Sequence, residues 1–366
     1  MTPDDITRRA ALGAGTVAFS ALALLDIANA TAMETPVRLS LNESPFGPCP
    51  LAKKAILDQV SQIDRYVGTE ARKLEEQIAT REGVSPDQII LGEILDVLGL
   101  QLALAGGPGG EFVYSEPGYT ALVDAVAPGG GVVVGVPLSA AFQNDLDAIA
   151  ARVNSRTRAI YLVNPHNPSG TVSEPHAFKA FLREMAARTV VIVDEAYLEY
   201  EPDFAKQTAV DLVRDGANVT VFRTFAKIYG LAGLAIGYAV APTALAKTLK
   251  DKGLGAPHEL NRLALAGASA CLRDKGYVAA VRDKVIAERT LWNALLDRLA
   301  IRHSDSRGNF VFFDCGRPHD VFAAAMLAQG VEIARSFPPL DRWARITIGL
   351  PKENARARAA VSRILG

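Results

Sequence analysis

Seven short apolar segments between residues 88 and 241 constrain the fold of this chain more than any other feature of its sequence. They are continuous runs rich in β-branched and aromatic residues, separated by stretches of helical or turn character. Runs without polar alternation are typical of strands buried on both faces of a sheet, and hence of largely parallel sheets covered by helices. The sequence therefore predicts an α/β domain with a mixed, mainly parallel seven-stranded sheet. The predicted strands are Ile89–Leu91, Phe112–Tyr114, Val132–Val136, Ala159–Val163, Val190–Val193, Val219–Phe222 and Ile236–Ala241.

Other segments predict further parts of the molecule. The chain has 366 residues, more than one hydrophobic core usually supports, which favours two lobes. Beyond residue 246, long helical stretches precede short strands at Phe310–Phe313 and Arg345–Ile348, a pattern typical of a smaller α+β domain. The segment Arg38–Pro50 is too rich in proline and glycine for a helix or strand, so we expect an arm laid over the surface. The predicted parts are a leader at 1–32, the arm at 33–50, a large domain at 51–245 and a small C-terminal domain at 246–366.

The N-terminus resembles an export signal. Thr7-Arg8-Arg9 precedes the weakly apolar run Ala10–Leu25, and small residues that suit a signal peptidase follow. Paired arginines before a Gly/Ala-rich run resemble a twin-arginine signal, which directs proteins that have already folded around a cofactor. We expect a periplasmic protein with no membrane segment in its mature form. A cytoplasmic location and an uncleaved anchor remain the alternatives.

Charge and cysteine content argue against several function classes. The 39 Lys and Arg residues nearly balance the 40 Asp and Glu residues, and no basic stretch carries interleaved aromatics, so a nucleic-acid partner is not expected. Cys49, Cys271 and Cys315 are odd in number and widely spaced, which predicts buried or spare thiols rather than a disulfide framework. The five histidines lack ligand spacing, and no metal site is predicted.

Lys227 and Asp194 carry the strongest chemical signal. Lys227 lies in the segment Thr224–Leu234 (TFAKIYGLAGL), just after a predicted strand, where its amine can form a Schiff base with an aldehyde. Asp194 ends the predicted strand Val190–Val193, and a carboxylate there can keep a bound pyridine ring protonated and electron-withdrawing. An aspartate at a strand end is by itself more often a helix N-cap. The presence of both residues favours the chemical interpretation.

These two segments and the turn Asn164–Gly170 (NPHNPSG) resemble the class I/II aminotransferases, the fold-type I enzymes that use pyridoxal 5′-phosphate (PLP). The resemblance is closest to their histidinol-phosphate aminotransferase-like branch, and it runs from about residue 37 to the C-terminus. It implies a large PLP-binding domain, a smaller α+β domain and a homodimer. It also implies transfer of an amino group between an amino acid and a 2-oxo acid, through a Schiff base at Lys227.

The resemblance assigns cofactor contacts to individual residues. Asp194 matches the partner of the pyridine nitrogen, and Tyr197 and Asn167 match the groups that bond the ring oxygen. Tyr119 matches the aromatic side chain that stacks on the ring, although a core or edge tyrosine is the equal alternative. Tyr66 matches a tyrosine that crosses the dimer interface to the neighbouring subunit's cofactor phosphate.

Substrate contacts are implied at the other side of the site. Arg345 matches the arginine that binds the substrate α-carboxylate as a planar fork. Arg335 matches an arginine that faces the substrate side chain, with a surface role as the alternative. Asn42 lies in the arm sequence Asn42–Pro48 (NESPFGP), which resembles the NENPYGP arm of the branch.

Three positions depart from the family pattern, and all three would touch the cofactor phosphate. The Gly-x-Gly-Ser turn is replaced by Gly92–Leu95 (GEIL), the serine before the lysine is Ala226, and the arginine eight residues after it is Ala235. The phosphate grip is therefore expected to be altered. The remaining contacts expected for a phosphate are Thr224, Tyr66 and the backbone N–H groups of the helix start near Leu95.

Two other functions stay open beside the aminotransferase. The same fold and cofactor support decarboxylation or elimination, as in the related threonine-phosphate decarboxylase. A non-catalytic exported binding protein would retain the fold and lose the coenzyme. Because the groups that act on carbon are retained together while only the phosphate contacts are lost, the sequence favours a working PLP-dependent aminotransferase.

Overall fold

The computed structural model describes residues 35–366. Residues 38–366 form one compact unit, and residues 1–37 are grouped separately. The predicted leader at 1–32 lies outside the described residues. Everything below concerns the larger unit.

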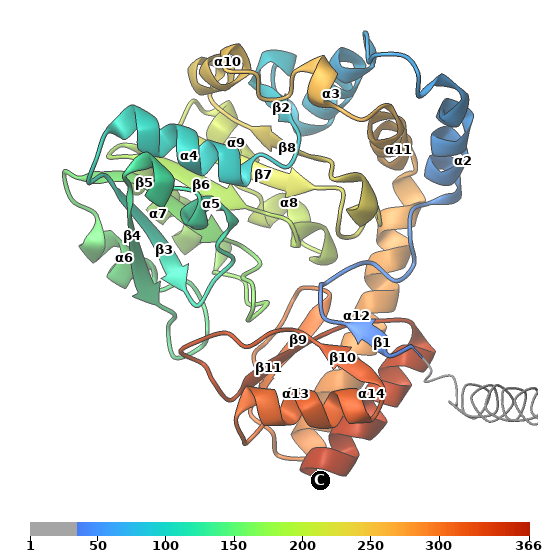
Figure 1. Ribbon diagram of the computed structural model, residues 1–366. Coiled ribbons are helices and arrows are strands. Elements are labelled where there is room, and N and C mark those ends of the chain that lie inside the picture. The colour runs from blue at the N-terminus through green and yellow to red at the C-terminus, as the bar shows by residue number, and fades with distance from the viewer. Residues whose placement is uncertain (1–34) are drawn as a thin grey trace, which may run out of the picture. The chain divides into compact units, whose positions relative to one another are not determined.

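A seven-stranded sheet forms the centre of this unit, in the order β2-β8-β7-β6-β5-β3-β4 (Figure 1). Strand β8 runs antiparallel to both β2 and β7, and the other neighbouring strands are parallel. The predicted sheet and all seven of its strands are confirmed. The strands are β2 (Ile89–Leu91), β3 (Glu111–Glu116), β4 (Val132–Pro137), β5 (Thr157–Val163), β6 (Val190–Asp194), β7 (Val219–Thr224) and β8 (Gly237–Val240).

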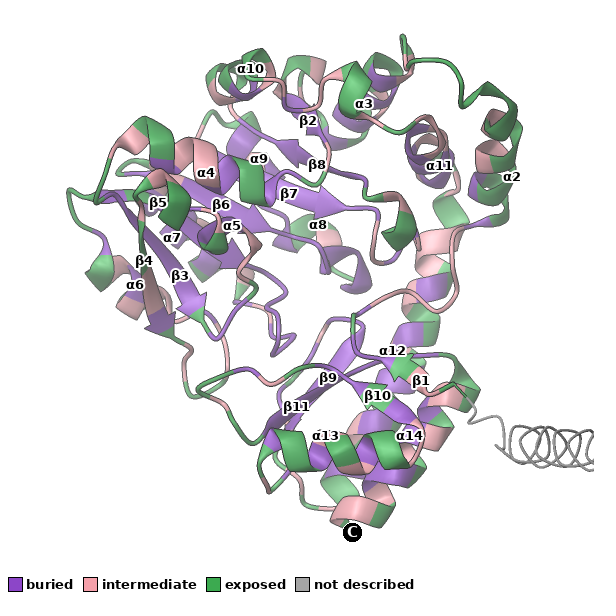
Figure 2. Cartoon of the chain, in the orientation of Figure 1, coloured by how far each residue is buried: buried purple, intermediate pink, exposed green. Residues whose placement is uncertain are grey.

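Burial explains why these segments lack polar alternation. Strands β7 and β8 are buried at every residue, whereas the edge strand β4 is largely exposed or half-buried (Figure 2). Helices cover the inner strands: α4 packs near β5, α7 on β6 and α9 on β7. The described helices before the C-terminal part are α2 (Pro50–Gln59), α3 (Glu70–Glu82), α4 (Leu95–Gly106), α5 (Ala121–Asp124), α6 (Leu146–Arg152), α7 (Pro175–Ala186), α8 (Phe204–Gln207), α9 (Val210–Arg214) and α10 (Thr243–Asp251).

The C-terminal part contains two small sheets and the longest helix (Figure 1). Strand β11 (Trp343–Thr347) pairs antiparallel with β9 (Phe310–Asp314), and β10 (Val331–Ile333) pairs with β1 (Val37–Leu39). The prediction that Arg38–Pro50 contains no regular structure is wrong at both ends. Strand pairing extends β1 to Leu39, and helix α2 begins at Pro50, where proline suits the first turn. The remaining helices are α11 (Arg262–Arg273), α12 (Lys275–Arg298), α13 (His319–Ala328) and α14 (Pro351–Leu365).

A buried ion network joins the ends of β6 and β7. The guanidinium of Arg223 donates to Glu195 Oε2 at 2.8 and 3.0 Å and to Glu82 Oε1 at 2.7 Å, and all three side chains are buried. Glu195 also accepts from the backbone N–H of Ala209 at 2.6 Å. Buried charges are tolerated when they are paired and hydrogen-bonded in this way. The network fixes the position of Glu195, the residue that directly follows Asp194.

Two further findings concern the described part of the chain. No helix within residues 35–366 is long and apolar enough to cross a membrane. Cys49, Cys271 and Cys315 are buried free thiols, as the sequence predicts.

Candidate functional site

Lys227 lines two neighbouring cavities beyond the carboxyl ends of β6 and β7. This is the edge at which ligands bind in open α/β sheets. The first, which we name the acidic cavity, has a volume of about 340 Å³. The second, the arginine cavity, has a volume of about 460 Å³. Tyr119 and Tyr197 line both cavities, so the amine of Lys227 can reach groups held in either one.

The residues that define each cavity come from separate segments. The acidic cavity is lined by Glu93, Leu95, Asp96, Asp194, Phe222, Thr224, Ala226 and Ala235, in addition to the shared residues. The arginine cavity is lined by Ser40, Leu41, Asn42, Gly118, Asn167, Glu332, Arg335, Phe337 and Arg345.

Asp194 is a buried carboxylate in the wall of the acidic cavity. Its Oδ1 accepts from the backbone N–H of Ala196 at 2.9 Å, and its Oδ2 accepts from the hydroxyl of Tyr161 at 3.1 Å. Burial raises the pKa of Asp194 to about 7, and these hydrogen bonds and the charge of Lys227 offset only part of the effect. A cationic partner inside the cavity would stabilise the ionised form.

Three polar side chains meet between the two cavities. The hydroxyl of Tyr197 accepts from Asn42 Nδ2 at 3.1 Å and from Asn167 Nδ2 at 3.4 Å. Lys227 Nζ lies 5.8 Å from the centre of the Tyr197 ring. Asn42 adopts a left-handed backbone conformation with φ 56°, and its N–H and Oδ1 both bond the hydroxyl of Thr347. The structure therefore brings together Asn42, Asn167, Tyr197 and Lys227 from four separate segments of the chain.

Arg345 is a buried cation without an acidic partner. Its Nη1 donates to Asn167 Oδ1 at 2.6 Å and its Nη2 donates to the carbonyl of Ser40 at 2.8 Å, but Nε has no partner. No carboxylate among residues 35–366 forms an ion pair with it. Burial lowers the pKa of Arg345 to about 10. A buried guanidinium with a spare donor is suited to bind an anion from solution.

Arg335 and Tyr119 lie at more open positions. Arg335 is exposed, donates to the carbonyl of Ser336 at 2.9 Å and stacks on Phe337 at 4.9 Å. It lines the same cavity as Arg345, which gives that cavity two guanidinium groups in addition to the amine of Lys227. Tyr119 is 43 % exposed, with its ring lining both cavities. An open aromatic face in this position is free to stack on a planar ligand.

A carboxylate occupies the part of the acidic cavity where the sequence departs from its family pattern. Thr224 Oγ1 donates to Glu93 Oε1 at 2.5 Å, and it accepts from the backbone N–H of Ala226 at 2.9 Å. Burial by the cavity walls raises the pKa of Glu93, and the bond to Thr224 and the charge of Lys227 offset part of this effect. Next to it, Asp96 Oδ1 accepts from the N–H of Val97 in the first turn of α4 at 2.8 Å.

Tyr66 is the predicted site residue that the structure does not bring to Lys227 within the chain. It is 88 % exposed and lines a separate pocket with Arg65, Asn261 and Arg262. Leu95 and Thr224, by contrast, line the acidic cavity together with Lys227.

Sequence reasoning missed several polar groups that complete the site. Tyr161 lies inside an apolar run, and nothing in the sequence indicates that its hydroxyl belongs to the site. In the structure, the register of β5 with β6 pairs Tyr161 with Ile192, near the carboxyl end of β6. Glu93 could have been found as an acid in a segment expected to bind an anion. The carbonyl of Ser40 and the hydroxyl of Thr347 are contributed by long-range packing and have no motif of their own.

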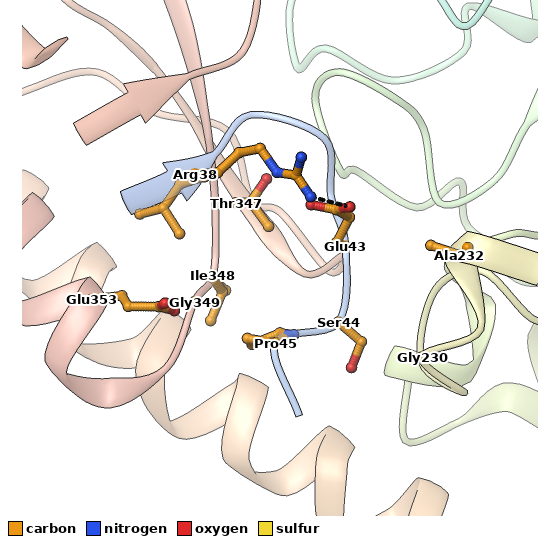
Figure 3. Close-up of a pocket in the computed structure, with 12 residues that line it drawn as sticks. Arg38, Glu43, Ser44, Pro45, Gly230, Ala232, Thr347, Ile348, Gly349 and Glu353 are labelled. Atoms are coloured by element: carbon orange, nitrogen blue, oxygen red, sulfur yellow. Dashed lines mark hydrogen bonds and ion pairs between the residues drawn. The ribbon is translucent and has the colours of Figure 1, made fainter. Parts of the chain in front are cut away.

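A further cavity lies beside the arm, between Ser44–Pro45 and the strand end Thr347–Gly349 (Figure 3). Its one arginine, Arg38, is paired with Glu43 at 2.8 Å. Gly230 of the lysine segment lines it with φ 71°, and an added Cβ there would clash with the backbone of Gly47. The arm is therefore packed directly against the segment that carries Lys227. No group of side chains able to hold a metal ion occurs among the described residues.

Comparisons with known proteins agree with this geometry. The chain matches the family Aminotransferase class I and II over residues 34–363. It is 33 % identical to the histidinol-phosphate aminotransferase of Limosilactobacillus fermentum, over 89 % of this chain and 90 % of the relative. It is 36 % identical to histidinol-phosphate aminotransferase 1 of Cupriavidus pinatubonensis, over 90 % and 88 %. The crystal structure of histidinol-phosphate aminotransferase from Sinorhizobium meliloti in complex with pyridoxal-5′-phosphate superposes with a TM-score of 0.82 and 30 % identity, over 90 % and 91 % of the two chains.

The raised pKa of Asp194 predicts how stability depends on pH without ligand. The pKa of Asp194 is about 7 in the folded protein and 3.8 for an ordinary aspartate, as in the unfolded chain. Its contribution to the free energy of unfolding is therefore fully present below pH 3.8 and is lost as the pH rises through 7. We expect the free energy of unfolding, measured with urea, to fall between about pH 4 and 7, and to fall less steeply in Asp194→Asn. Asp147→Asn, at an exposed position, is the control. Parallel curves for Asp194→Asn and the unaltered protein would contradict this prediction.

Proposed function

Because the chain belongs to the class I and II aminotransferases, a PLP-dependent family, we propose that it moves the amino group of an anionic amine to a 2-oxo acid at Lys227. The matches confirm the predicted fold-type I, PLP-dependent aminotransferase, and they do not support the non-catalytic interpretation. The observation that carries the substrate class is Arg345, a buried arginine with no acidic partner in the cavity that Lys227 lines.

The residues around Lys227 fit the ring of PLP. The buried carboxyl of Asp194, with its raised pKa, suits a protonated pyridine nitrogen, and the open face of Tyr119 suits a planar ring. Tyr197 and Asn167 present a hydroxyl and an amide N–H toward the same region, where they can bond a ring oxygen. When bound, PLP supplies an aldehyde that condenses with amines and a cationic ring that withdraws electrons from the substrate.

Arg345 orients the substrate. Its spare Nε and its Nη groups form a fork that can bind a carboxylate through two parallel hydrogen bonds. Asn167 and the Ser40 carbonyl hold the guanidinium in place, so little rotational freedom is lost when the anion binds. An α-carboxylate held there fixes the direction of the Cα–H bond relative to Lys227.

Lys227 transfers the proton. Its amine lies between the two cavities and can take a proton from the substrate Cα and return it to a neighbouring carbon. The aromatic walls formed by Tyr197 and Tyr119 limit the access of water to that amine, which favours proton return over loss to solvent.

A phosphorylated amino alcohol is the second candidate substrate. The arginine cavity holds Arg335 as well as Arg345, and two cations suit a dianionic phosphate ester. The relatives named above are histidinol-phosphate aminotransferases, which supports histidinol phosphate as the ester to test first.

We expect Arg345→Ala to lower kcat/KM for amino acids by about a hundredfold or more, because the carboxylate loses its fork. Arg345→Lys should recover only part of the loss, since an ammonium group cannot form the fork. The absorbance change of the cofactor-loaded enzyme in a single turnover is measured with an amino acid and with histidinol phosphate, which compares the two candidate substrates. Lys227→Ala is the control that should abolish turnover. Equal turnover of amino acids and of simple amines without an anionic group by the unaltered enzyme would contradict the role of Arg345.

We propose that the active form is a homodimer. Apolar side chains gather in exposed positions from α2 to the following turn: Leu57, Val60, Ile63 and Tyr66 are 70 %, 46 %, 68 % and 88 % exposed. Exposed apolar patches of this kind are typical of protein interfaces. The match of Tyr66 to a tyrosine that reaches the neighbouring subunit's cofactor phosphate supports this proposal.

Ile63→Asp should therefore yield monomers, because it places a charge in the proposed interface. Leu291→Asp, at a position 51 % exposed on α12, is the matched control and should remain dimeric. Light scattering of the purified proteins gives the mass. A monomeric unaltered protein would refute the homodimer.

We propose in addition that the protein is exported to the periplasm after folding. The support is the sequence Thr7-Arg8-Arg9 before an apolar run, which lies outside the described residues. The double substitution Arg8→Lys/Arg9→Lys should leave folded precursor in the cytoplasm, measured by cell fractionation. Unimpaired export of this variant would exclude the twin-arginine route.

A further inference from the structure

The acidic cavity has a second end that the ring contacts do not explain. It is formed where the turn after β2 meets the start of β8 and the end of β7. Gly92 donates to the carbonyl of Gly237 on β8 at 2.9 Å, and Glu93 accepts from the hydroxyl of Thr224 on β7 at 2.5 Å. Ala226 and Ala235 complete this end. These are the positions at which the sequence departs from the family pattern for binding a phosphate.

The side-chain donor at this end, the hydroxyl of Thr224, is already engaged by one of the chain's own carboxylates. The hydroxyl of Thr224 donates to Glu93, and the N–H of Ala226 donates back to that hydroxyl. The N–H of Val97, in the first turn of α4, donates to Asp96. A phosphate placed here would have to displace Glu93 from Thr224 before it gained a hydroxyl donor.

The charge at this end is also wrong for a phosphate. Apart from Asp194 at the ring end, two carboxylates, those of Glu93 and Asp96, line the acidic cavity, and Lys227 is the only basic side chain among the described residues that line it. A phosphate monoester carries a charge between about −1.5 and −2 at neutral pH. Carboxylates beside such a group repel it, and alanines at 226 and 235 provide no compensating cation or hydroxyl.

We propose that this end of the acidic cavity receives a neutral hydroxymethyl group, so that the chain prefers pyridoxal to its 5′-phosphate, with Glu93 accepting the hydroxyl hydrogen. A carboxylate is a strong acceptor for a hydroxyl, and Glu93 already holds the hydroxyl of Thr224 in this way. The small side chains at 226 and 235 leave room for the group. The inference rests on the proposed function, because it requires an aldehyde of this class at Lys227.

The discriminating residue is Glu93 rather than the acidic cavity as a whole. Asp194 belongs to the ring end, where Tyr161 and the Ala196 N–H hold it. Asp96 is turned to the N–H of Val97, and its carboxylate is stabilised by the first turn of α4. Of these three carboxylates, only that of Glu93 bonds Thr224, one of the residues expected to hold a phosphate.

A competition at Lys227 tests the preference without measuring turnover. The full-length protein is mixed with equal amounts of pyridoxal and PLP, and then with borohydride. Each aldehyde condenses with the Lys227 amine and releases one water, and borohydride adds a hydride to the carbon of the C=N bond while nitrogen takes a proton. Mass spectrometry of the Lys227 peptide then gives the ratio of the two adducts, which differ by one phosphoryl group. Nα-acetyl-lysine in the same mixture corrects for the intrinsic reactivity of the aldehydes.

We expect the corrected ratio to favour the pyridoxyl adduct in the unaltered protein. Glu93→Gln should shift it toward the phosphorylated adduct by about tenfold, which corresponds to about 1.4 kcal/mol. Ala235→Arg should shift it in the same direction, because it adds a cation. Asp96→Asn is the matched control, which removes a carboxylate from the same cavity without touching Thr224, and it should shift the ratio far less.

Each other outcome overturns the inference. A ratio that favours the phosphorylated adduct in the unaltered protein refutes it and leaves the aminotransferase function intact. This result would also follow if a partner subunit supplied the missing cation. Equal shifts in Asp96→Asn and Glu93→Gln refute the assignment to Glu93. No adduct at Lys227 from either aldehyde refutes both the inference and the proposed function.

Discussion

The hydrogen bonds of the Arg345 guanidinium connect the parts of this molecule on which its chemistry depends. One reaches Asn167, in the turn that follows β5, and the other reaches the carbonyl of Ser40, in the arm. Arg345 itself lies on β11 in the C-terminal part. Three segments separated by more than a hundred residues are thus held at fixed positions around one buried charge. Since no carboxylate among the described residues pairs with this guanidinium, it can bind an anionic ligand directly.

The site contains an unpaired cation and an unpaired anion on the two sides of Lys227. Arg345 forms no ion pair with a described carboxylate, although Glu332 also lines the arginine cavity, and Asp194 forms none with Lys227, which also lines the acidic cavity. Burial therefore moves both pKa values toward the neutral forms. Each charge destabilises the ligand-free fold and favours a bound partner of opposite sign. A cofactor ring with a protonated nitrogen and a substrate with a carboxylate satisfy both at once. The amine between them is then in reach of both molecules.

The sheet and most of the site could be predicted from the sequence, for different reasons. The inner strands were predictable because burial on both faces leaves few polar residues in their runs, and the exposed edge strand β4 was predictable from its run of valines. Lys227, Asp194 and Asn167 were predictable because each follows a strand in a distinctive local motif. The bonds of Glu93 to Thr224 and of Tyr161 to Asp194 were not, because they depend on strand order and register, which place distant residues side by side. The prediction for the two ends of the arm was wrong, because strand pairing at one end and helix initiation at the other prevailed over local composition.

The ion network below the site also limits how this chain can change over evolutionary time. Arg223 directly precedes Thr224, and Glu195 directly follows Asp194. The bond between them therefore sets the spacing between the two strand ends that carry the site. Replacing Arg223 alone would leave the buried carboxylates of Glu195 and Glu82 without their cation, a loss typically of about 3–5 kcal/mol. That is a large fraction of the stability of an ordinary domain. Arg223 is therefore expected to resist substitution, whereas Ala226 and Ala235, which line the acidic cavity, can change one at a time, so cofactor preference can drift while the catalytic frame stays in place.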